Sequence, residues 1–114
     1  LVGPPELAPA DMAGDGIDVT EDLDGTLPGV DAVMMLRVQF ERDASVGDNY
    51  ADRYGLTTQR ASLLPAHAPV MHPGPMNRGF EIDDDVADGP RSIVVEQVAC
   101  GVAMRMAVLE RLLS

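Results

Sequence analysis

The chain has 114 residues, of which 46% are apolar, which is enough for one folded domain and argues against disorder. Nineteen acids, eight arginines and no lysine give a formal net charge of −11, which disfavours binding to nucleic acid and to anionic membrane surfaces. A single cysteine excludes an internal disulfide, and no apolar run approaches the roughly 20 residues of a membrane span.

Four apolar stretches have the character of strands, at residues 1–2, 17–19, 31–38 and 68–71. The first is short and runs into a turn, and the chain does not begin with methionine, so we expect a piece of a longer protein. Residues 31–38 are nearly continuous in apolar side chains, which predicts a strand buried on both faces of a parallel sheet.

Helical patterns alternate with these strands. One begins at residues 20–23 and ends at Pro28-Gly29, and a second covers residues 57–64 and ends at Pro65. Strand and helix in alternation predict an α/β fold: a doubly wound, mainly parallel sheet with flanking helices.

The last and clearest helix is expected from Ile93 to Leu113. Asp88-Gly89-Pro90 would supply its capping acid and a proline near its first position. Its apolar residues predict wide burial, including Cys100 as a buried, inert thiol, and Gly101 predicts close packing against another helix. We therefore divide the chain into residues 1–92 and a carboxyl-terminal helix, 93–114.

Two acid-rich stretches, residues 12–16 and 83–85, are interpreted as solvated loops. The triplet Asp83-Asp84-Asp85 offers oxygen ligands for a hard cation, but no EF-hand spacing follows it, so no metal site is predicted.

The first candidate binding segment follows the strand at 31–38. If the extended backbone persists, Arg37, Gln39 and Glu41 point the same way, because alternate side chains share a face. An arginine beside a primary amide makes a receptor for a carboxylate, and Glu41 would hold the arginine in place. The plain alternative is a strand-end arginine in a surface ion pair.

The second candidate segment is His72-Pro73-Gly74-Pro75, directly after the strand at 68–71. Proline removes backbone donors and glycine permits close approach, so this turn presents carbonyls that can accept hydrogen bonds from an amine or amide. The Gly74-Pro75 bond is a candidate cis peptide, and His72 is expected to orient the turn, whereas His67 is expected to be exposed. The alternative is a rigid turn that binds no ligand.

Both candidate segments follow strands that are predicted neighbours. In open α/β sheets, ligands bind outside the carboxyl ends of the strands. A carboxylate receptor facing a carbonyl-lined turn suits an amino acid, with its carboxylate on Arg37 and its amine toward Gly74.

Four groups of residues occur in order along the chain: Arg37-Val38-Gln39 followed by Glu41-Arg42; Tyr54-Gly55-Leu56-Thr57; His72-Pro73-Gly74-Pro75-Met76-Asn77-Arg78-Gly79 with Glu81-Ile82-Asp83; and Gln97, Gly101 and Arg105-Met106-Ala107-Val108-Leu109. In this order they resemble the catalytic chain of the aspartate carbamoyltransferase family. The resemblance covers about the last third of the family's usual chain. It implies that residues 1–92 are part of the aspartate-binding domain and that the helix at 93–114 would pack on a carbamoyl-phosphate domain, which we expect to lie outside this sequence. The Ser-Met-Gly loop and His-Cys-Leu-Pro turn typical of the related ornithine enzymes are not found.

The resemblance implies a role for each matching position. Arg37 and Gln39 would bind L-aspartate, with Glu41 orienting Arg37. Gly74 and Pro75 would contact carbamoyl phosphate and the incoming amine, with His72 and Pro73 supporting the turn. The implied reaction gives N-carbamoyl-L-aspartate and phosphate in pyrimidine biosynthesis, in a cytoplasmic homotrimer that in some members carries regulatory chains, without metal or other cofactor.

The resemblance also implies limits. The stretch from Asp43 to Asn49 is shorter than the family's loop there, and Cys100 stands where many members have asparagine. The isolated chain is expected to be inactive without the carbamoyl-phosphate domain. Two alternatives are a non-catalytic structural or interaction module of the same fold and a carbamoyltransferase for another amine acceptor.

Overall fold

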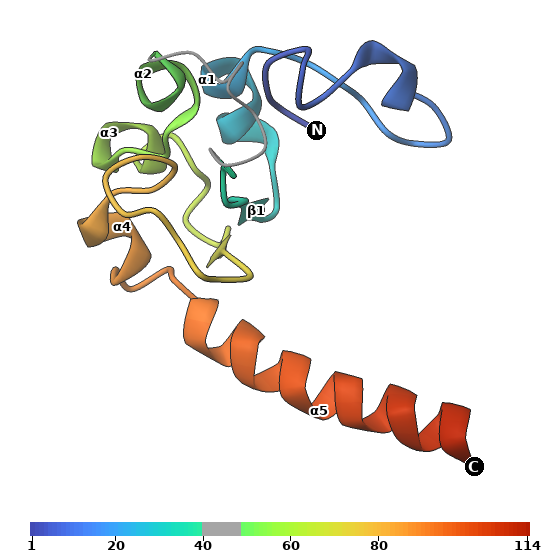
Figure 1. Cartoon of the computed structure of the whole chain (residues 1–114). Coiled ribbons are helices and arrows are strands. Elements are labelled where there is room, and N and C mark those ends of the chain that lie inside the picture. The colour runs from blue at the N-terminus through green and yellow to red at the C-terminus, as the bar shows by residue number, and fades with distance from the viewer. Residues whose placement is uncertain (40–48) are drawn as a thin grey trace.

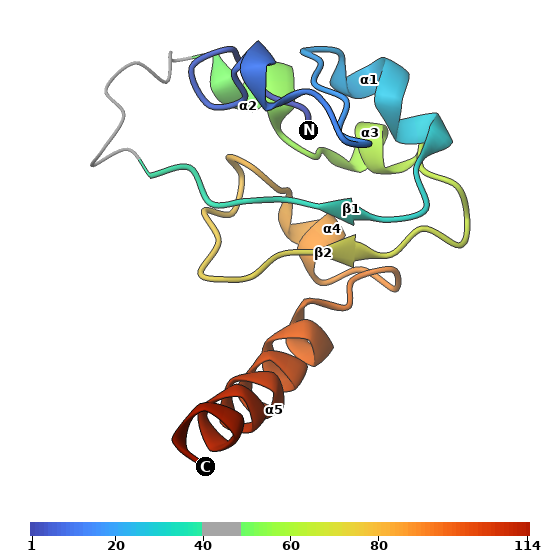
Figure 2. The same ribbon diagram turned by 90° about the vertical axis from the view of Figure 1, so that its right-hand side faces the viewer.

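The computed structural model describes residues 1–39 and 49–114, and it has short helices around one pair of parallel strands. In chain order its elements are η1 (Ala10–Met12), α1 (Leu23–Thr26), η2 (Leu27–Gly29), β1 (Val33–Met34), α2 (Tyr50–Tyr54), α3 (Thr58–Ala61), β2 (Val70–Met71), α4 (Asp84–Ala87) and α5 (Val94–Leu113). Helices α1, α2 and α3 lie on one side of the strands, and α5 extends away on the other (Figure 1, Figure 2). The predicted α/β class, a parallel sheet with flanking helices, is confirmed.

Strand β2 has a paired segment on each side. Strand β1 pairs with it in parallel, with Val33 opposite Val70 and Met34 opposite Met71. On the other edge, the Val70 N–H donates to the Arg91 carbonyl (2.8 Å), and the Ile93 N–H donates to the Val70 carbonyl (2.9 Å). A short segment centred on Ser92 therefore pairs with β2 just before α5.

The predicted helix at 93–113 agrees with α5 to within one residue, but the capping role predicted for Asp88-Gly89-Pro90 was wrong. Asp88 is the C-cap of α4, and α5 begins at Val94 with Ile93 as its N-cap, without a side-chain capping bond. Pro90 consequently lies in a turn, outside the first position of α5. Pairing of residues 91–93 with β2 separates this turn from α5.

The two amino-terminal strands that the sequence predicted are reduced to isolated bridges. Val2 pairs with Thr20, and Ile17 pairs with Gly14 across a tight turn. Asp15 and Gly16 adopt positive φ values of 50° and 84° in that turn, a conformation that Gly and Asp tolerate best. The acid-rich stretch at 12–16 is exposed, as predicted.

The segment at 31–38, predicted to be a strand buried on both faces, is partly exposed. Met35 and Val38 are buried, at 8% and 4% exposure, whereas Met34 is 50% and Leu36 is 59% exposed. Within the described residues, helices cover only the face that carries Met35. A run of apolar residues therefore did not distinguish a strand covered on one face from one covered on both.

The core lies between β2 and the short helices. It joins one cluster of buried side chains: Leu23, Leu27, Met35, Leu56, Ala61, Leu64, Ala68, Val70, Ile82, Val86 and Ala87. Helices α1, α3 and α4, the turn η2 and strand β2 each contribute a residue to this cluster, and β1 borders it. Neither α2 nor α5 contributes a residue.

Side-chain caps hold the short helices, which are too short to be stable alone. Asp22 Oδ1 accepts from the Gly25 N–H at 2.9 Å to begin α1, and Thr57 Oγ1 accepts from the Arg60 N–H at 3.2 Å to begin α3. The Arg60 guanidinium then donates to the carbonyls of Gly55 and Asp52, both at 2.9 Å, and closes the end of α2. The predicted helices at 20–29 and 57–64 are thus present in shorter form.

Helix α5 is exposed over most of its length, so the predicted wide burial was wrong for this chain. Only Val94 is buried, while Val95, Met104 and Leu112 are 79%, 67% and 77% exposed. Cys100 is exposed as well, which corrects its predicted burial.

The predicted packing of Gly101 against another helix is not seen within the described residues. A Cβ at Gly101 would meet the Arg105 side chain of α5 itself, at 3.3 Å. As for membranes, no helix in the described ranges has both the length and the apolar character needed to cross one.

Gly55 joins α2 to the core, and it should not tolerate a side chain. A Cβ there would lie 2.6 Å from the Ala51 carbonyl oxygen and 2.7 Å from that of Phe80, so the backbone must move. We expect Gly55→Ala to lower the free energy of unfolding by about 1–3 kcal/mol, the usual cost of overpacking. Urea unfolding followed by tyrosine fluorescence would measure it.

Gly29 provides the matched control. A Cβ at Gly29 has no neighbour within 4 Å among the described residues. Gly29→Ala should therefore change the stability by less than about 1 kcal/mol. Equal destabilisation by the two substitutions would contradict the packing seen around Gly55.

Candidate functional site

The turn after β2, residues 72–79, is called the proline-rich turn. Hydrogen bonds hold its first residues in place. The His72 N–H donates to Gln97 Oε1 of α5, and the Gly74 N–H donates to His72 Nδ1, both at 2.9 Å. The Gly74-Pro75 peptide bond is cis, as the sequence suggested, and Gly74 has a φ of 62°, which glycine adopts without strain. Pro73 and Pro75 are exposed. The turn is held from inside and presents its prolines to solvent.

Beneath the turn lies a buried pair of polar side chains. His72 and Glu81 are both 0% exposed, and His72 Nε2 lies 3.2 Å from Glu81 Oε1. Because Nδ1 accepts from Gly74, the hydrogen-bond network assigns the ring proton to Nε2, which donates to Glu81. The Asn77 N–H donates to the same carboxylate oxygen at 2.5 Å. The prediction that His72 orients the turn agrees with these contacts.

The resemblance includes Glu81, but no role was predicted for it, because an acid in an acid-rich chain is usually solvated. The signal that was available is its position. It immediately precedes Ile82, which is buried, and it follows the exposed turn residues Arg78 and Gly79.

The two candidate binding segments are neighbours, as predicted. The Met35 N–H donates to the Met71 carbonyl at 2.9 Å, which extends the pairing of β1 with β2. Further along, Asn77 Nδ2 donates to the Val38 carbonyl at 3.1 Å. The backbone between Arg37 and Gln39 is therefore tied directly to the proline-rich turn.

Arg37 and Gln39 are both exposed at this junction. Strand β1 ends at Met34, and burial of Met35 and Val38, three residues apart, breaks the strict alternation that the shared face required. Glu41 lies outside the described residues. That Arg37 and Gln39 bind a carboxylate stays a prediction.

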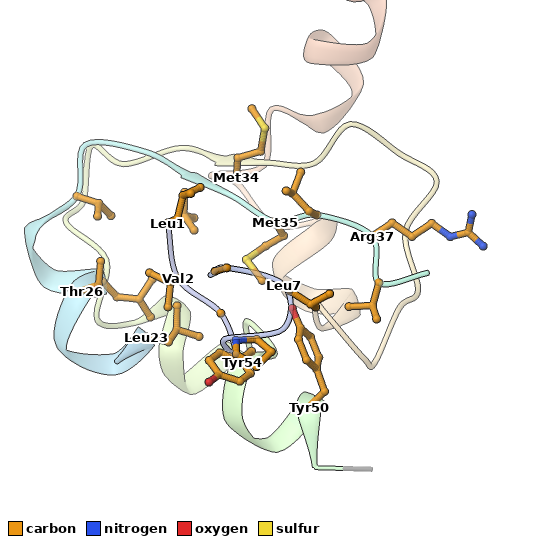
Figure 3. Close-up of a pocket in the computed structure, with 18 of the residues that line it drawn as sticks. Leu1, Val2, Leu7, Leu23, Thr26, Met34, Met35, Arg37, Tyr50 and Tyr54 are labelled. Atoms are coloured by element: carbon orange, nitrogen blue, oxygen red, sulfur yellow. The ribbon is translucent and has the colours of Figure 1, made fainter. Parts of the chain in front are cut away.

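A hollow of about 620 Å³ adjoins the segment. Its walls are mainly apolar side chains from the amino-terminal residues, α1 and β1, with Tyr50 and Tyr54 on one side (Figure 3). Arg37 lies at its edge, and its guanidinium points away from the hollow in Figure 3. The charged end of Arg37 therefore does not reach into the hollow.

Tyr50 connects the hollow to the turn region. Its ring stacks on Phe80 with centroids 5.4 Å apart and lies 5.3 Å from the Tyr54 ring. Burial raises the pKa of the Tyr50 hydroxyl above its usual value, with smaller contributions from the charge of Glu81 and from Tyr54. Tyr50 therefore stays a neutral phenol well beyond neutral pH.

The end of the turn is anchored by Arg78. Its guanidinium makes two bonds of 2.8 Å to the Asp88 carboxylate and one of 3.0 Å to Asp84 Oδ1. The hydrogen bonds from Arg78 hold the pKa of Asp88 below its usual value. The pairing joins the turn to α4.

The acid triplet is not the solvated loop that was predicted. Asp83 is the N-cap of α4, and Asp84 and Asp85 lie in its first turn. The positive end of the helix dipole stabilises carboxylates at this position. Asp83 also accepts from the Thr58 N–H at 3.0 Å. No group of three potential metal ligands occurs in residues 1–39 and 49–114. His67 lies on the surface, as predicted, 3.1 Å from Asp31.

Residues 6–112 match the family model described as aspartate/ornithine carbamoyltransferase, Asp/Orn binding domain. The chain belongs to this family. The match includes both candidate segments and nearly all of α5, so the resemblance drawn from the sequence is confirmed.

Relatives named aspartate carbamoyltransferase catalytic subunit match almost the whole chain. The one from Acidothermus cellulolyticus is 56% identical over 117 residues, covering 99% of this chain and 36% of the relative. The one from Salinispora tropica is 56% identical over 123 residues, covering 99% and 39%. The chain thus spans less than two-fifths of the length of these relatives.

Solved carbamoyltransferases share the fold. Aspartate transcarbamoylase from Trypanosoma cruzi, in complex with carbamoyl phosphate, matches with a TM-score of 0.69 and 31% identity over 82% of this chain and 30% of that one. Ornithine carbamoyltransferase from Burkholderia thailandensis matches with a TM-score of 0.76 over 96% of this chain and 36% of that one, at 24% identity. The second likeness bears on the fold alone.

Proposed function

We propose that the chain supplies the aspartate-recognition part of an aspartate carbamoyltransferase. The observation that carries this proposal is its identity of 51–56% to catalytic subunits of that name over at least 99% of its length. The geometry agrees with the proposal, because the Asn77 bond to the Val38 carbonyl brings the Arg37 segment beside the Gly74-Pro75 turn.

In this proposal, each segment handles one end of L-aspartate. Arg37, with two parallel donors and a fixed charge, binds the side-chain carboxylate, and Gln39 adds a neutral donor. The carbonyls of the Gly74-Pro75 turn accept hydrogen bonds from the substrate amine and from the amino group of carbamoyl phosphate. These contacts orient the amine toward the carbamoyl carbon, which is where much of the rate gain arises.

The reaction itself is a group transfer. The amine nitrogen donates its lone pair to the carbamoyl carbon, the bond from that carbon to the phosphate oxygen breaks, and phosphate leaves with the bonding pair. The amine passes one proton to the leaving phosphate and becomes the carbamoyl amide nitrogen. This chain contributes orientation and hydrogen-bond acceptors, while the carbamoyl-phosphate domain supplies the rest of the site, in a cytoplasmic homotrimer with or without regulatory chains. Residues 93–114 pack on that domain.

A chimeric enzyme tests the proposal. Residues 1–114 replace the matching segment of the Acidothermus cellulolyticus catalytic subunit, which they resemble at 56% identity. We expect carbamoyl-aspartate to form from carbamoyl phosphate and aspartate, and no product from ornithine. The relative truncated before the segment, and this chain alone, are expected to be inactive. A folded chimera that carbamoylates ornithine, or no amine at all, would overturn the proposal.

A further inference from the structure

Burial of Glu81 is unfavourable, because within the described residues only one of its two carboxylate oxygens accepts hydrogen bonds. Its side chain is 0% exposed, and Oε2 has no hydrogen-bond partner among the described residues. Removing a carboxylate from water costs several kcal/mol, and an apolar residue of similar volume is often at least as stable at such a position. This burial points to a task other than stabilising the fold.

The other oxygen, Oε1, connects Glu81 to both ends of the proline-rich turn. It accepts from His72 Nε2 at the start of the turn and from the Asn77 N–H toward its end. His72 passes the constraint on, because its Nδ1 accepts from the Gly74 N–H at 2.9 Å. One carboxylate oxygen thus determines the ring orientation and, through it, the peptide plane at Gly74.

We propose that Glu81 is a positioning residue for the carbonyls of the Gly74-Pro75 turn, acting through His72 and Asn77. The inference rests on the proposed function, in which those carbonyls align the attacking amine. Its charge is incidental, because the task is to place Oε1 within reach of two donors. Misplacing an orienting group by about 1 Å can cost about 10²-fold in rate.

Two substitutions distinguish a role for the position of Glu81 Oε1 from a role for the charge of the carboxylate. Glu81→Gln keeps the length of the side chain and a carbonyl oxygen that accepts from both donors, but removes the charge. Glu81→Asp keeps the charge but is one methylene shorter, which withdraws the oxygen from His72. Positioning predicts that glutamine substitutes well and aspartate poorly, whereas a proton-transfer or charge role predicts the reverse.

The first readout is nitrogen NMR of the 114-residue chain. In the wild type and in Glu81→Gln, we expect the His72 ring to have a pyridine-type δ1 and a pyrrole-type ε2 nitrogen, with a protected Gly74 amide. In Glu81→Asp, we expect averaged tautomers and faster exchange of the Gly74 amide. Glu110→Asp, on the exposed surface of α5, should change none of these signals. A pyrrole-type δ1 nitrogen in the wild type, or an unchanged His72 ring in Glu81→Asp, would overturn the proposal.

The second readout is the kinetics of the chimera. Glu81→Asp should lower kcat about 10²-fold with little change in the KM for aspartate, and Glu81→Gln should retain kcat within about tenfold. A raised KM with unchanged kcat, or an active aspartate variant beside an inactive glutamine variant, would refute the positioning role. If the unsubstituted chimera is inactive, the proposed function fails, while the NMR readout still decides the role of Glu81 in holding the turn.

Discussion

Replacing Arg37 with alanine in the chimera is expected to raise the KM for aspartate about 30- to 150-fold while kcat changes little. The guanidinium would make two charge-assisted hydrogen bonds to the substrate carboxylate, and losing them costs about 2–3 kcal/mol. Each 1.4 kcal/mol corresponds to about a factor of ten in affinity. Initial rates over a range of aspartate concentrations would give the two constants separately.

Arg53→Ala is the matched control for Arg37→Ala. The Arg53 side chain is 50% exposed and pairs with Glu21 at 3.0 Å, away from the turn. A surface ion pair of this kind contributes at most about 1 kcal/mol, so the KM for aspartate should stay within about twofold. If Arg37→Ala also left the KM unchanged, the assignment of Arg37 to the aspartate carboxylate would be wrong.

Leu56→Ala is expected to cause a large loss of stability. Leu56 is 0% exposed within the core cluster, between the end of α2 and the start of α3. Truncating a buried leucine costs about 2–5 kcal/mol, a large share of the total for a chain of this size. Urea unfolding followed by tyrosine fluorescence should show a lower midpoint or no cooperative transition.

The same chemical change at Leu112 provides the comparison, because this side chain is 77% exposed on α5. Leu112→Ala should alter the free energy of unfolding by no more than about 0.5 kcal/mol. Similar losses for both substitutions would mean that the core does not include Leu56 as described.

The fold class followed from the sequence because strand and helix signals alternate along the chain. The extent of the elements did not follow. Ile17 and Val19 are apolar and β-branched, but beside the tight turn at Asp15-Gly16 the pairing of Ile17 is reduced to a single bridge with Gly14. Residues 91–93 pair with β2 although no strand signal marks them. Pairing between distant segments depends on tertiary contacts, which local propensity does not encode.

The location of the candidate site could be predicted from the sequence, but the buried residues that hold it in place could not. Gly74 and Pro75 attract attention because a glycine between two prolines leaves a turn with few backbone donors, which presents its carbonyls. Glu81 does not, because what distinguishes it from the other acids of residues 1–39 and 49–114 is its burial. Burial of a polar residue is a property of the folded chain, so His72 and Glu81 become a pair only in the structure.

The exposed surface of α5 has a consequence for how the isolated chain behaves as a colloid. A helix of 20 residues extends for about 30 Å, and here most of its side chains are apolar and unburied. Contact between two such helices removes apolar area from water, while a net charge of −11 on each chain repels the approach. Salt shortens the range of that repulsion from about 10 Å at 0.1 M to about 3 Å at 1 M. Ionic strength therefore sets the balance between dispersed and self-associated chains, with low salt favouring dispersion.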